Sequence, residues 1–319
     1  MAKRAKTTKP AILPSNKQDP TGADSLERKA MKDFTRRMKK VGKAYLAALE
    51  RFPATLAVNA RYEYQLDPLL LTMILNDASM LADAVLLEGD QRNLWLTQEY
   101  IEPAAVRGTG QSYANLVQQS AAYAASNESL QAVLLSAPYQ KRMSLTYARE
   151  FEEMKGFSAD TKRSMARVLT DGIGRGLNPK EVARNLTSQV GIQTRRANTI
   201  ARTEITGALR RARWDEAKQA RDGLGLKTMM LHFSALSPTT RQTHAMRHGH
   251  LYTIEEVQEW YSIGANSINC KCTQVEVLVN EKGEPLNPGL IEASRKEFQT
   301  QWKNIAVNKS TCQCCAKAA

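Results

Sequence analysis

Two short stretches of the chain carry residue types that bind metals. The stretch "SINCKC" places Cys270 and Cys272 one residue apart in a chain with five cysteines, and "THAMRHGH" upstream holds three of its four histidines, His244, His248 and His250. Zn²⁺ prefers four imidazole and thiolate ligands, supplied by short-spaced pairs. The predicted site is a structural zinc held by His244, His250, Cys270 and Cys272, with His248 as an alternative to His250.

A metal-free interpretation of the same residues stays open. Cys-x-Cys is tighter than the usual two-residue gap of zinc sites, so both cysteines can instead be small core residues at the start of a strand. No glutamate accompanies the histidines in an HExxH arrangement, which disfavours a catalytic zinc. The remaining cysteines, Cys312, Cys314 and Cys315, lie in a tail without histidine and allow metal binding, cross-linking between copies or idle thiols.

The charge of the chain is concentrated in two segments. The net charge is +13, and residues 1–43 alone contain 13 Lys and Arg against 4 Asp and Glu. Residues 195–227 carry 9 basic and 4 acidic residues, whereas residues 61–150 carry 6 and 10. Such clustering favours a polyanion, because each neutralised phosphate releases counterions. The predicted DNA contacts are Lys3, Arg4, Lys6, Arg36, Arg37, Lys39, Lys40, Arg210, Arg211 and Arg213.

The amino-terminal sequence shows no secretory signal, and the cysteine count favours reduced thiols or metal binding. The start "MAKRAKTTKPAILPSNK" has no apolar segment of the kind that a secretory signal requires, and an odd number of cysteines argues against a disulfide framework. The most apolar run, residues 68–87, contains Asn76, Asp77 and Asp83. Such side chains are costly inside a bilayer, so we predict a buried core helix and no membrane association.

The first half of the chain reads as an arm followed by helices. Residues 1–24 are polar and predict a disordered basic arm, and residues 25–157 predict a helical scaffold domain. Its first helix starts near Ser25 and carries apolar residues at helical spacing. Asp67 is a predicted N-cap, "GTGQ" at 108–111 a predicted break, and Pro138 a predicted helix start.

The second half is punctuated more clearly. Glycines end a helix at 174–176, Asn178 caps the next one, and Gly191 is its predicted end. The following basic helix suggests a helix-turn-helix reader, but no short turn of the required kind is present. Two candidate strands, "LKTMMLHFSAL" and "TQVEVLVN", flank the histidine and cysteine stretches. We therefore predict an α+β fold, mostly helical with a small β-containing carboxyl-terminal unit, followed by a helix and cysteine-rich tail over 281–319.

Four motifs between residues 158 and 280 resemble those of a known family. They are "ARTE" at 201–204, Arg241 with "TH" at 243–244, Gly249, and "NCKC" at 269–272. This order is similar to the phage Mu F-like minor head proteins, the head morphogenesis family of tailed bacteriophages. Some relatives have cysteines at the places of Arg241 and His244, which looks like zinc ligation; here only His244 could bind metal.

The resemblance implies a structural component of the phage head. The expected location is the portal vertex of the virion, with the host cytoplasm as the site of assembly. The implied partners are the portal protein, the major capsid protein, packaged double-stranded DNA and further copies of the chain. No enzymatic activity is expected. The alternatives are a metal-dependent or ADP-ribosyltransferase-like enzyme module, to which the fold of the family has been related, and a free DNA-binding protein.

Overall fold

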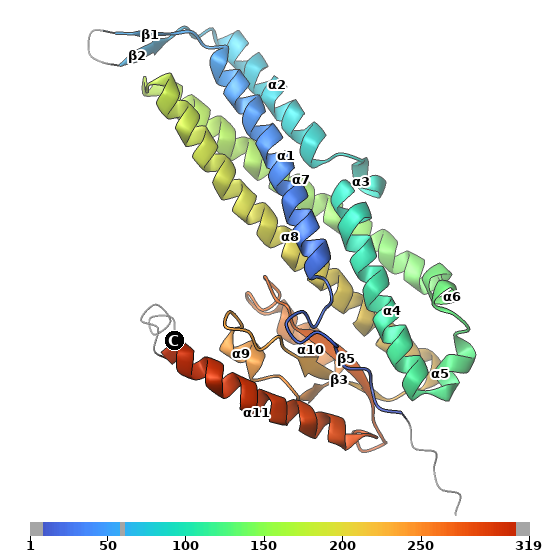
Figure 1. The fold of residues 1–319 in the computed structure, drawn as a ribbon. Helices are drawn as coiled ribbons and strands as arrows, with labels where there is room; N and C mark the ends of the chain where they lie inside the picture. Colours follow the sequence, from blue (N-terminus) through green and yellow to red (C-terminus); the bar gives the residue numbers. More distant parts are fainter. Residues whose placement is uncertain (1–8, 58–60, 311–319) are drawn as a thin grey trace, which may run out of the picture. The chain divides into compact units, whose positions relative to one another are not determined.

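The computed structural model describes residues 9–57 and 61–310, which form two units that alternate along the sequence (Figure 1). The chain is mostly helical (69%), with a three-stranded sheet in the region 228–278, so the predicted α+β class is confirmed. The predicted domain boundary at residue 157 instead falls inside a long helix. Unit 1 comprises the described residues up to Leu26, Ile101–Gln140 and everything from Arg202, and unit 2 comprises Glu27–Tyr100 and Lys141–Ala201.

Unit 2 is built mainly from four helices. They are α1 (Asp24–Glu50), α2 (Pro68–Leu86), the second part of α7 (Ala137–Gly174) and the first part of α8 (Pro179–Leu224). Arg37 of α1 donates a hydrogen bond to the Val85 carbonyl of α2, and Lys162 of α7 pairs with Asp83. Gly42 of α1 faces Val190 of α8 so closely that an added Cβ would lie 2.7 Å from it. The four helices therefore contact one another directly.

The predicted helix near Ser25 is α1, and its apolar spacing explains its packing. Phe34, Met38, Val41 and Tyr45 are all buried, as positions three or four apart on one helix face should be. Most of its Lys and Arg side chains occupy the opposite face, which is exposed, whereas Arg37 is buried. A hairpin not anticipated from the sequence, β1 (Ala54–Leu56) with β2 (Tyr62–Tyr64), then leads to α2.

The start of α2 follows the prediction, but its burial does not. The Asp67 carboxylate accepts hydrogen bonds from the Leu69 and Leu70 amides, which caps the helix as expected. Only Ile74, Ala78, Ala82 and Leu86 are buried. The predicted buried core helix is thus wrong, because Ile74 and Leu86 are the only large apolar side chains of α2 that are buried. It is also the one helix among the described residues that is long and apolar enough to cross a membrane, with a mean hydropathy of 1.6.

The segment after α2 leads into unit 1 through short helices. These are α3 (Asp90–Asn93), the π-helical turn η1 (Thr97–Ile101), α4 (Glu102–Gln119), α5 (Ala121–Ser126) and α6 (Leu130–Leu135). The predicted break at 108–111 is wrong, since α4 runs through it. A Cβ on Gly108 would lie 2.2 Å from the Leu209 carbonyl oxygen of α8. That glycine therefore permits a close helix–helix approach and does not end a helix.

The longest helix, α8, contains 46 residues and belongs to both units. Its start follows the prediction: the Asn178 side chain accepts from the Lys180 amide, and Pro179 is the first helical residue. The predicted end at Gly191 is wrong. A mid-helix glycine costs only about 1 kcal/mol relative to alanine, which the packing on both sides of it outweighs. The continuous helix also leaves no helix-turn-helix in this part of the chain.

Unit 1 contains a small antiparallel sheet in the order β4-β3-β5. The predicted strands are β3 (Thr228–Phe233) and β5 (Thr273–Leu278), with Met230 opposite Glu276, and β4 (Leu251–Tyr252) pairs with the other edge of β3. All six residues of β5 are buried. The helices around the sheet are α9 (Gln242–Ala245), α10 (Ile254–Ser262) and α11 (Pro288–Ser310).

The two faces of the sheet are covered differently. Leu231, Val275 and Val277 pack with Ile291 of α11 and with Ala11, a residue of the amino-terminal segment. On the other face, Gln274 and Glu276 are fully buried and contact side chains of α8. The alternation in "TQVEVLVN" therefore reflects an apolar and a polar interior face.

The amino-terminal segment is ordered where the structure describes it. The Ile12 amide donates to Asn115 of α4 at 2.7 Å, and Gln118 donates to the Pro10 carbonyl. Thr21 and Ala23 are fully buried. The prediction of a disordered arm over 1–24 is thus wrong for residues 9–24, because apolar and backbone groups of the segment find partners in unit 1. Residues 1–8 lie outside the described part of the chain.

Candidate metal centre

The two cysteines are held at the entry to β5 by contacts with α8. Asn269 adopts a left-handed backbone conformation, with φ at 51°, which asparagine tolerates better than most residues. Its amide donates to the Thr203 hydroxyl at 3.2 Å. Arg210 lies about two helical turns after Thr203 on α8. It donates to the carbonyl oxygens of Cys270 and Cys272 at 2.9 and 3.3 Å. Residues of "ARTE" and "NCKC" therefore meet in the fold.

His244 reaches the cysteines from the short helix α9. Arg241 directly precedes α9. Its guanidinium donates to the carbonyl oxygens of Asn266 and Ile268 at 3.0 and 3.1 Å. These carbonyls belong to the loop that leads into Cys270. Arg241 thus ties the histidine-bearing loop to the cysteine-bearing loop, which sets the distance between their side chains.

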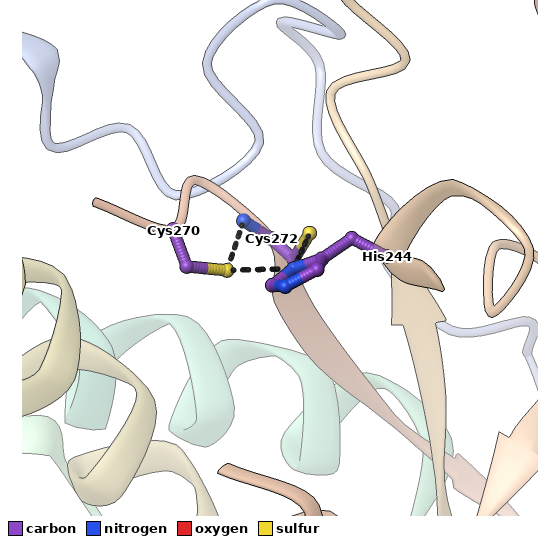
Figure 2. Close-up of side chains that lie close together, drawn as sticks. All are labelled: His244, Cys270 and Cys272. Carbon is purple, nitrogen blue, oxygen red and sulfur yellow. Dashed lines mark hydrogen bonds between the residues drawn. The ribbon is translucent and has the colours of Figure 1, made fainter. Parts of the chain in front are cut away.

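The His244, Cys270 and Cys272 side chains converge on one point (Figure 2). The His244 Nδ1 atom lies 3.3 Å from the Cys270 Sγ atom and 3.6 Å from the Cys272 Sγ atom. Zn–S and Zn–N bonds of about 2.3 and 2.0 Å in a tetrahedron put sulfur and nitrogen roughly 3.5 Å apart. Both sulfur–nitrogen distances therefore match those around a zinc ion, and all three ligand atoms lie within 4.8 Å of one another.

The electrostatic surroundings favour one thiolate in the group. Burial alone raises the pKa of Cys270, but the hydrogen bond with Cys272, the charge of Arg210 and the hydrogen bond with His244 together hold that pKa well below its usual range. The hydrogen bond with Cys270 and burial raise the pKa of Cys272 well above its usual range. Thiolates are the metal-binding form of cysteine. The lowered pKa therefore favours Cys270 as a thiolate ligand.

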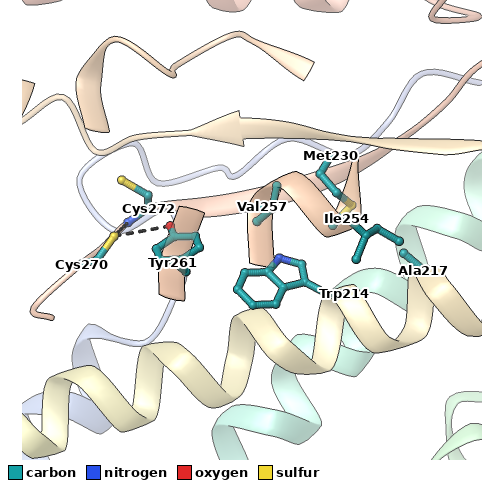
Figure 3. Close-up of a cluster of buried hydrophobic side chains, with 8 residues drawn as sticks. All are labelled: Trp214, Ala217, Met230, Ile254, Val257, Tyr261, Cys270 and Cys272. Atoms are coloured by element: carbon teal, nitrogen blue, oxygen red, sulfur yellow. Dashed lines mark hydrogen bonds between the residues drawn. The ribbon is translucent and has the colours of Figure 1, made fainter. Parts of the chain in front are cut away.

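The group lies at one end of an apolar cluster (Figure 3). The Tyr261 ring, from α10, stacks near Trp214 of α8, and the Arg210 guanidinium lies 4.5 Å from the centre of the Tyr261 ring. The Tyr261 hydroxyl is 3.5 Å from the Cys270 Sγ atom. A low-dielectric environment of this kind strengthens metal–thiolate attraction and limits access of water.

Three of the four predicted ligands come together in this arrangement. His244, Cys270 and Cys272 come together, whereas His250 is exposed and belongs to no such group. His248 is buried elsewhere, where its Nδ1 atom accepts the Ser234 amide at 3.1 Å. The reason is local: Met246 to His250 form a tight turn into β4 rather than a helix that would stack His244 on His248. The described residues thus offer three ligands.

A fourth histidine was not singled out from the sequence because it stands alone in the β3 pattern. His232 is fully buried, and its Nδ1 atom lies 3.2 Å from the Gln274 amide nitrogen. Burial lowers the pKa of His232 well below its usual range, so the ring is neutral. The Nε2 atoms of His232 and His244 both lack hydrogen-bond partners among the described residues.

Three of the predicted DNA contacts are buried instead. Arg213 forms a two-pronged ion pair with the Glu276 carboxylate, at 2.6 and 3.0 Å, with 4% and 0% of the two side chains exposed. Arg210 holds the cysteine backbone, and Arg37 lies over the Trp95 ring and against Glu88. The prediction is wrong for these three because buried guanidinium groups cannot reach a phosphate.

The other predicted contacts differ in accessibility. Arg211 is half-buried beside Glu204, and Arg36 is exposed but bound to Asp33. Lys39 and Lys40 are exposed. Lys3, Arg4 and Lys6 lie outside the described residues.

The exposed basic residues of α1 form a continuous stripe that extends beyond the predicted set. At 3.6 residues per turn they fall within an arc of about 120° and span roughly 22 Å of helix. We call this the α1 basic stripe. It consists of Arg28, Lys29, Lys32, Arg36, Lys39, Lys40 and Lys43. Four of its members were missed in the sequence, although helical spacing alone could have identified them.

Comparison with known proteins supports one assignment. Residues 163–275 match the family model described as "Phage Mu protein F like protein". The matched range begins in α7 and ends in β5, so it includes the contacts between α8 and the cysteines and the whole His244 loop. No curated protein and no solved structure matches the chain.

Proposed function

We propose that this chain, whose residues 163–275 belong to the phage Mu protein F-like family, is a structural minor head protein of a tailed double-stranded DNA bacteriophage. Membership of the family implies a role in phage head morphogenesis. The proposed location is the portal vertex of the virion, with the portal and major capsid proteins as partners. The family match carries this proposal.

The contacts made by the family motifs support a structural role rather than an enzymatic one. Thr203 of "ARTE" holds the loop before Cys270, and Arg241 ties together the two loops that carry the metal-binding side chains. Arg210 of α8 binds the Cys270 carbonyl just before β5, and Arg213 binds Glu276 within β5. These polar groups are used to hold elements in place, which is what an assembly component requires.

A structural zinc ion held by His244, Cys270 and Cys272 is the second part of the proposal. The spacing of the three ligand atoms and the apolar surroundings support it. The ion would fasten α9 to the entry of β5, a contact otherwise made by side chains alone. Purified protein should contain one equivalent of zinc, and Cys272→Ser should lose it. Protein that folds fully with no zinc after growth in zinc-supplemented medium would contradict this part.

The α1 basic stripe is the proposed contact with packaged DNA. Its residues are exposed and belong to one helix face, whereas the buried arginines of α8 are engaged within the protein. A row of lysine and arginine without base-reading geometry binds phosphates without sequence preference. A head protein should therefore bind random and specific duplexes equally well, which distinguishes it from a free DNA-binding regulator.

Co-expression with the portal protein of the same phage tests the main proposal. Affinity pull-down at about 0.5 M salt removes loose charge-driven contacts, because the Debye length is then only a few ångströms. Retention of the portal on the chain is expected. Retention by the Lys39→Gln, Lys40→Gln variant would show that the contact does not depend on the positive charge of these lysines. Loss of the portal from both proteins would overturn the portal assignment.

A further inference from the structure

The exposed face of α2 gathers several large apolar side chains that the packing of unit 2 leaves uncovered. The exposed fractions are 76% for Leu69, 58% for Met73, 70% for Met80 and 55% for Leu81. The buried face of the helix is narrow and consists of two alanines, one isoleucine and one leucine. Patches of several hundred Å² on soluble proteins usually mark interaction sites. The composition of this face is therefore typical of a surface that meets a binding partner.

Polar residues at the centre of the face restrict what can cover it. Asn76 and Asp77 are exposed between the two apolar halves, and the Asp77 carboxylate is bound to Arg51 at 2.7 Å. Transfer of this ion pair into hydrocarbon would leave charges without water, which is costly. A protein surface that offers apolar groups at both ends and hydrogen-bonding groups at the centre fits better.

The face of α2 has this complementarity to itself. The helix runs from Pro68 to Leu86, so its midpoint lies at Asp77. In an antiparallel pair with a twofold axis near that midpoint, Met73 lies opposite the partner's Met80, and Leu69 lies opposite the small side chain of the partner's Ala84. The Asn76 amide comes opposite the partner's Asp77 carboxylate. Each contact occurs twice, as an isologous interface requires.

We propose that α2 is a dimerisation helix, which pairs antiparallel with α2 of a second copy of this chain. The pairing places methionine against methionine and leucine against alanine, and it brings the polar centres of the two helices within reach of hydrogen bonds. The methionines suit such a seam because their flexible thioether side chains fill irregular spaces. This inference does not depend on the proposed role in phage heads.

The first test is the oligomeric state of the full-length chain. Sedimentation velocity over a range of micromolar concentrations should show a reversible dimer. Met80→Glu should weaken dimerisation by roughly 100-fold, because both Met73–Met80 contacts are lost at once. Leu145→Glu, at an exposed leucine of α7, is the matched control and should leave the dimer unchanged. A dimer that survives Met80→Glu, or a chain that stays monomeric throughout, would overturn the proposal.

The second test decides the direction of the two helices. Met73→Glu and Met80→Lys, each in its own chain, should both be monomeric alone and should form a heterodimer when mixed. In the antiparallel pair the introduced carboxylate lies opposite the introduced ammonium, whereas in a parallel pair they lie about 10 Å apart, at 1.5 Å rise per residue. No heterodimer on mixing would contradict the antiparallel arrangement. Flotation of the wild-type chain with neutral lipid vesicles would assign the face to a membrane instead.

Discussion

The basic segments of α1 and α8 look alike in the sequence and have opposite surroundings in the fold. Both contain paired arginines within an amphipathic helix, and both were predicted to bind DNA. In α1 the apolar residues occupy one face and most lysines and arginines the other, which is exposed; Arg37 is a buried exception. In the unit 1 part of α8, Ala208, Ala212 and Ala217 are buried on different sides of the helix together with Arg210 and Arg213. That part of the helix is enclosed by its neighbours.

The difference lies in the apolar residues rather than in the charges. A single apolar stripe leaves the remaining faces to solvent, and long basic side chains are then free to meet a polyanion. Small residues all round a helix allow neighbours to approach from every side, so an arginine there must find a partner inside the protein. Arg213 does so with Glu276, and Arg210 does so with backbone carbonyls. Identical residue types are thus left exposed to solvent in one case and form part of a structural core in the other.

The largest effect should follow removal of a buried charge from α8. Arg213→Ala leaves the Glu276 carboxylate buried without its ion-pair partner, which should cost about 3–5 kcal/mol of unfolding free energy. Urea unfolding monitored by circular dichroism measures this. Combining Arg213→Met with Glu276→Gln should recover much of the loss, because no uncompensated charge remains. An Arg213→Ala protein as stable as wild type would show that the pair is not buried in solution.

On α1, the same kind of change should affect DNA binding rather than folding. Replacing Lys32, Lys39, Lys40 and Lys43 by glutamine should weaken duplex binding on the order of 100-fold at low salt and reduce the slope of log K against log salt by about 3–4. Four glutamines at the exposed lysines 141, 155, 180 and 227 are the control. Equal losses in both variants would mean that binding follows net charge and not the α1 basic stripe.

A third comparison uses two glycines, Gly108 in a crowded helix contact of unit 1 and Gly191 in an open part of α8 in unit 2. Gly108→Ala places a methyl group against the Leu209 backbone where α4 meets α8, and should cost about 1–3 kcal/mol. Gly191→Ala, in the unit 2 part of α8, meets no atom within 4 Å and should stabilise the helix by up to about 1 kcal/mol. Opposite signs in thermal unfolding would confirm the distinction, and equal signs would remove it.

The smallest effect is expected for a single lysine of the α1 basic stripe. Lys39→Ala changes an exposed side chain without a buried partner, so the unfolding free energy should change by less than about 0.5 kcal/mol. A larger loss, measured in the same urea titration as Arg213→Ala, would show that Lys39 makes stabilising contacts and that α1 is not the simple surface helix described above.

Local patterns predicted the elements of the fold well. Asp67 and Asn178 cap the helices that follow them, and the two strands around the cysteines were predicted in place. Glycine was the main source of error, since Gly108 and Gly191 were taken as helix ends. Gly108 allows close packing against Leu209, about a hundred residues away in the chain, whereas Gly191 is simply tolerated inside α8. Neither can be distinguished in sequence from a glycine that ends a helix.

The candidate site was predictable in its residue types but not in its membership. Cys270, Cys272 and His244 were named correctly as a group that could hold zinc, yet His250 was included and Arg210 was assigned to DNA. Both errors concern tertiary position: a turn after Met246 directs His250 to solvent, and the enclosed part of α8 directs Arg210 to the cysteine backbone. The distribution of apolar side chains on α2 likewise shows only in the fold.

The presence of the chain in purified virions tests the proposed head role most directly. Heads of the phage that encodes it should be separated on a density gradient, treated with nuclease, washed in about 0.5 M salt and measured by quantitative mass spectrometry. The proposal predicts that the chain remains, at a constant ratio to the portal protein. A chain that is abundant in the lysate but absent from washed virions would contradict a structural role in the head.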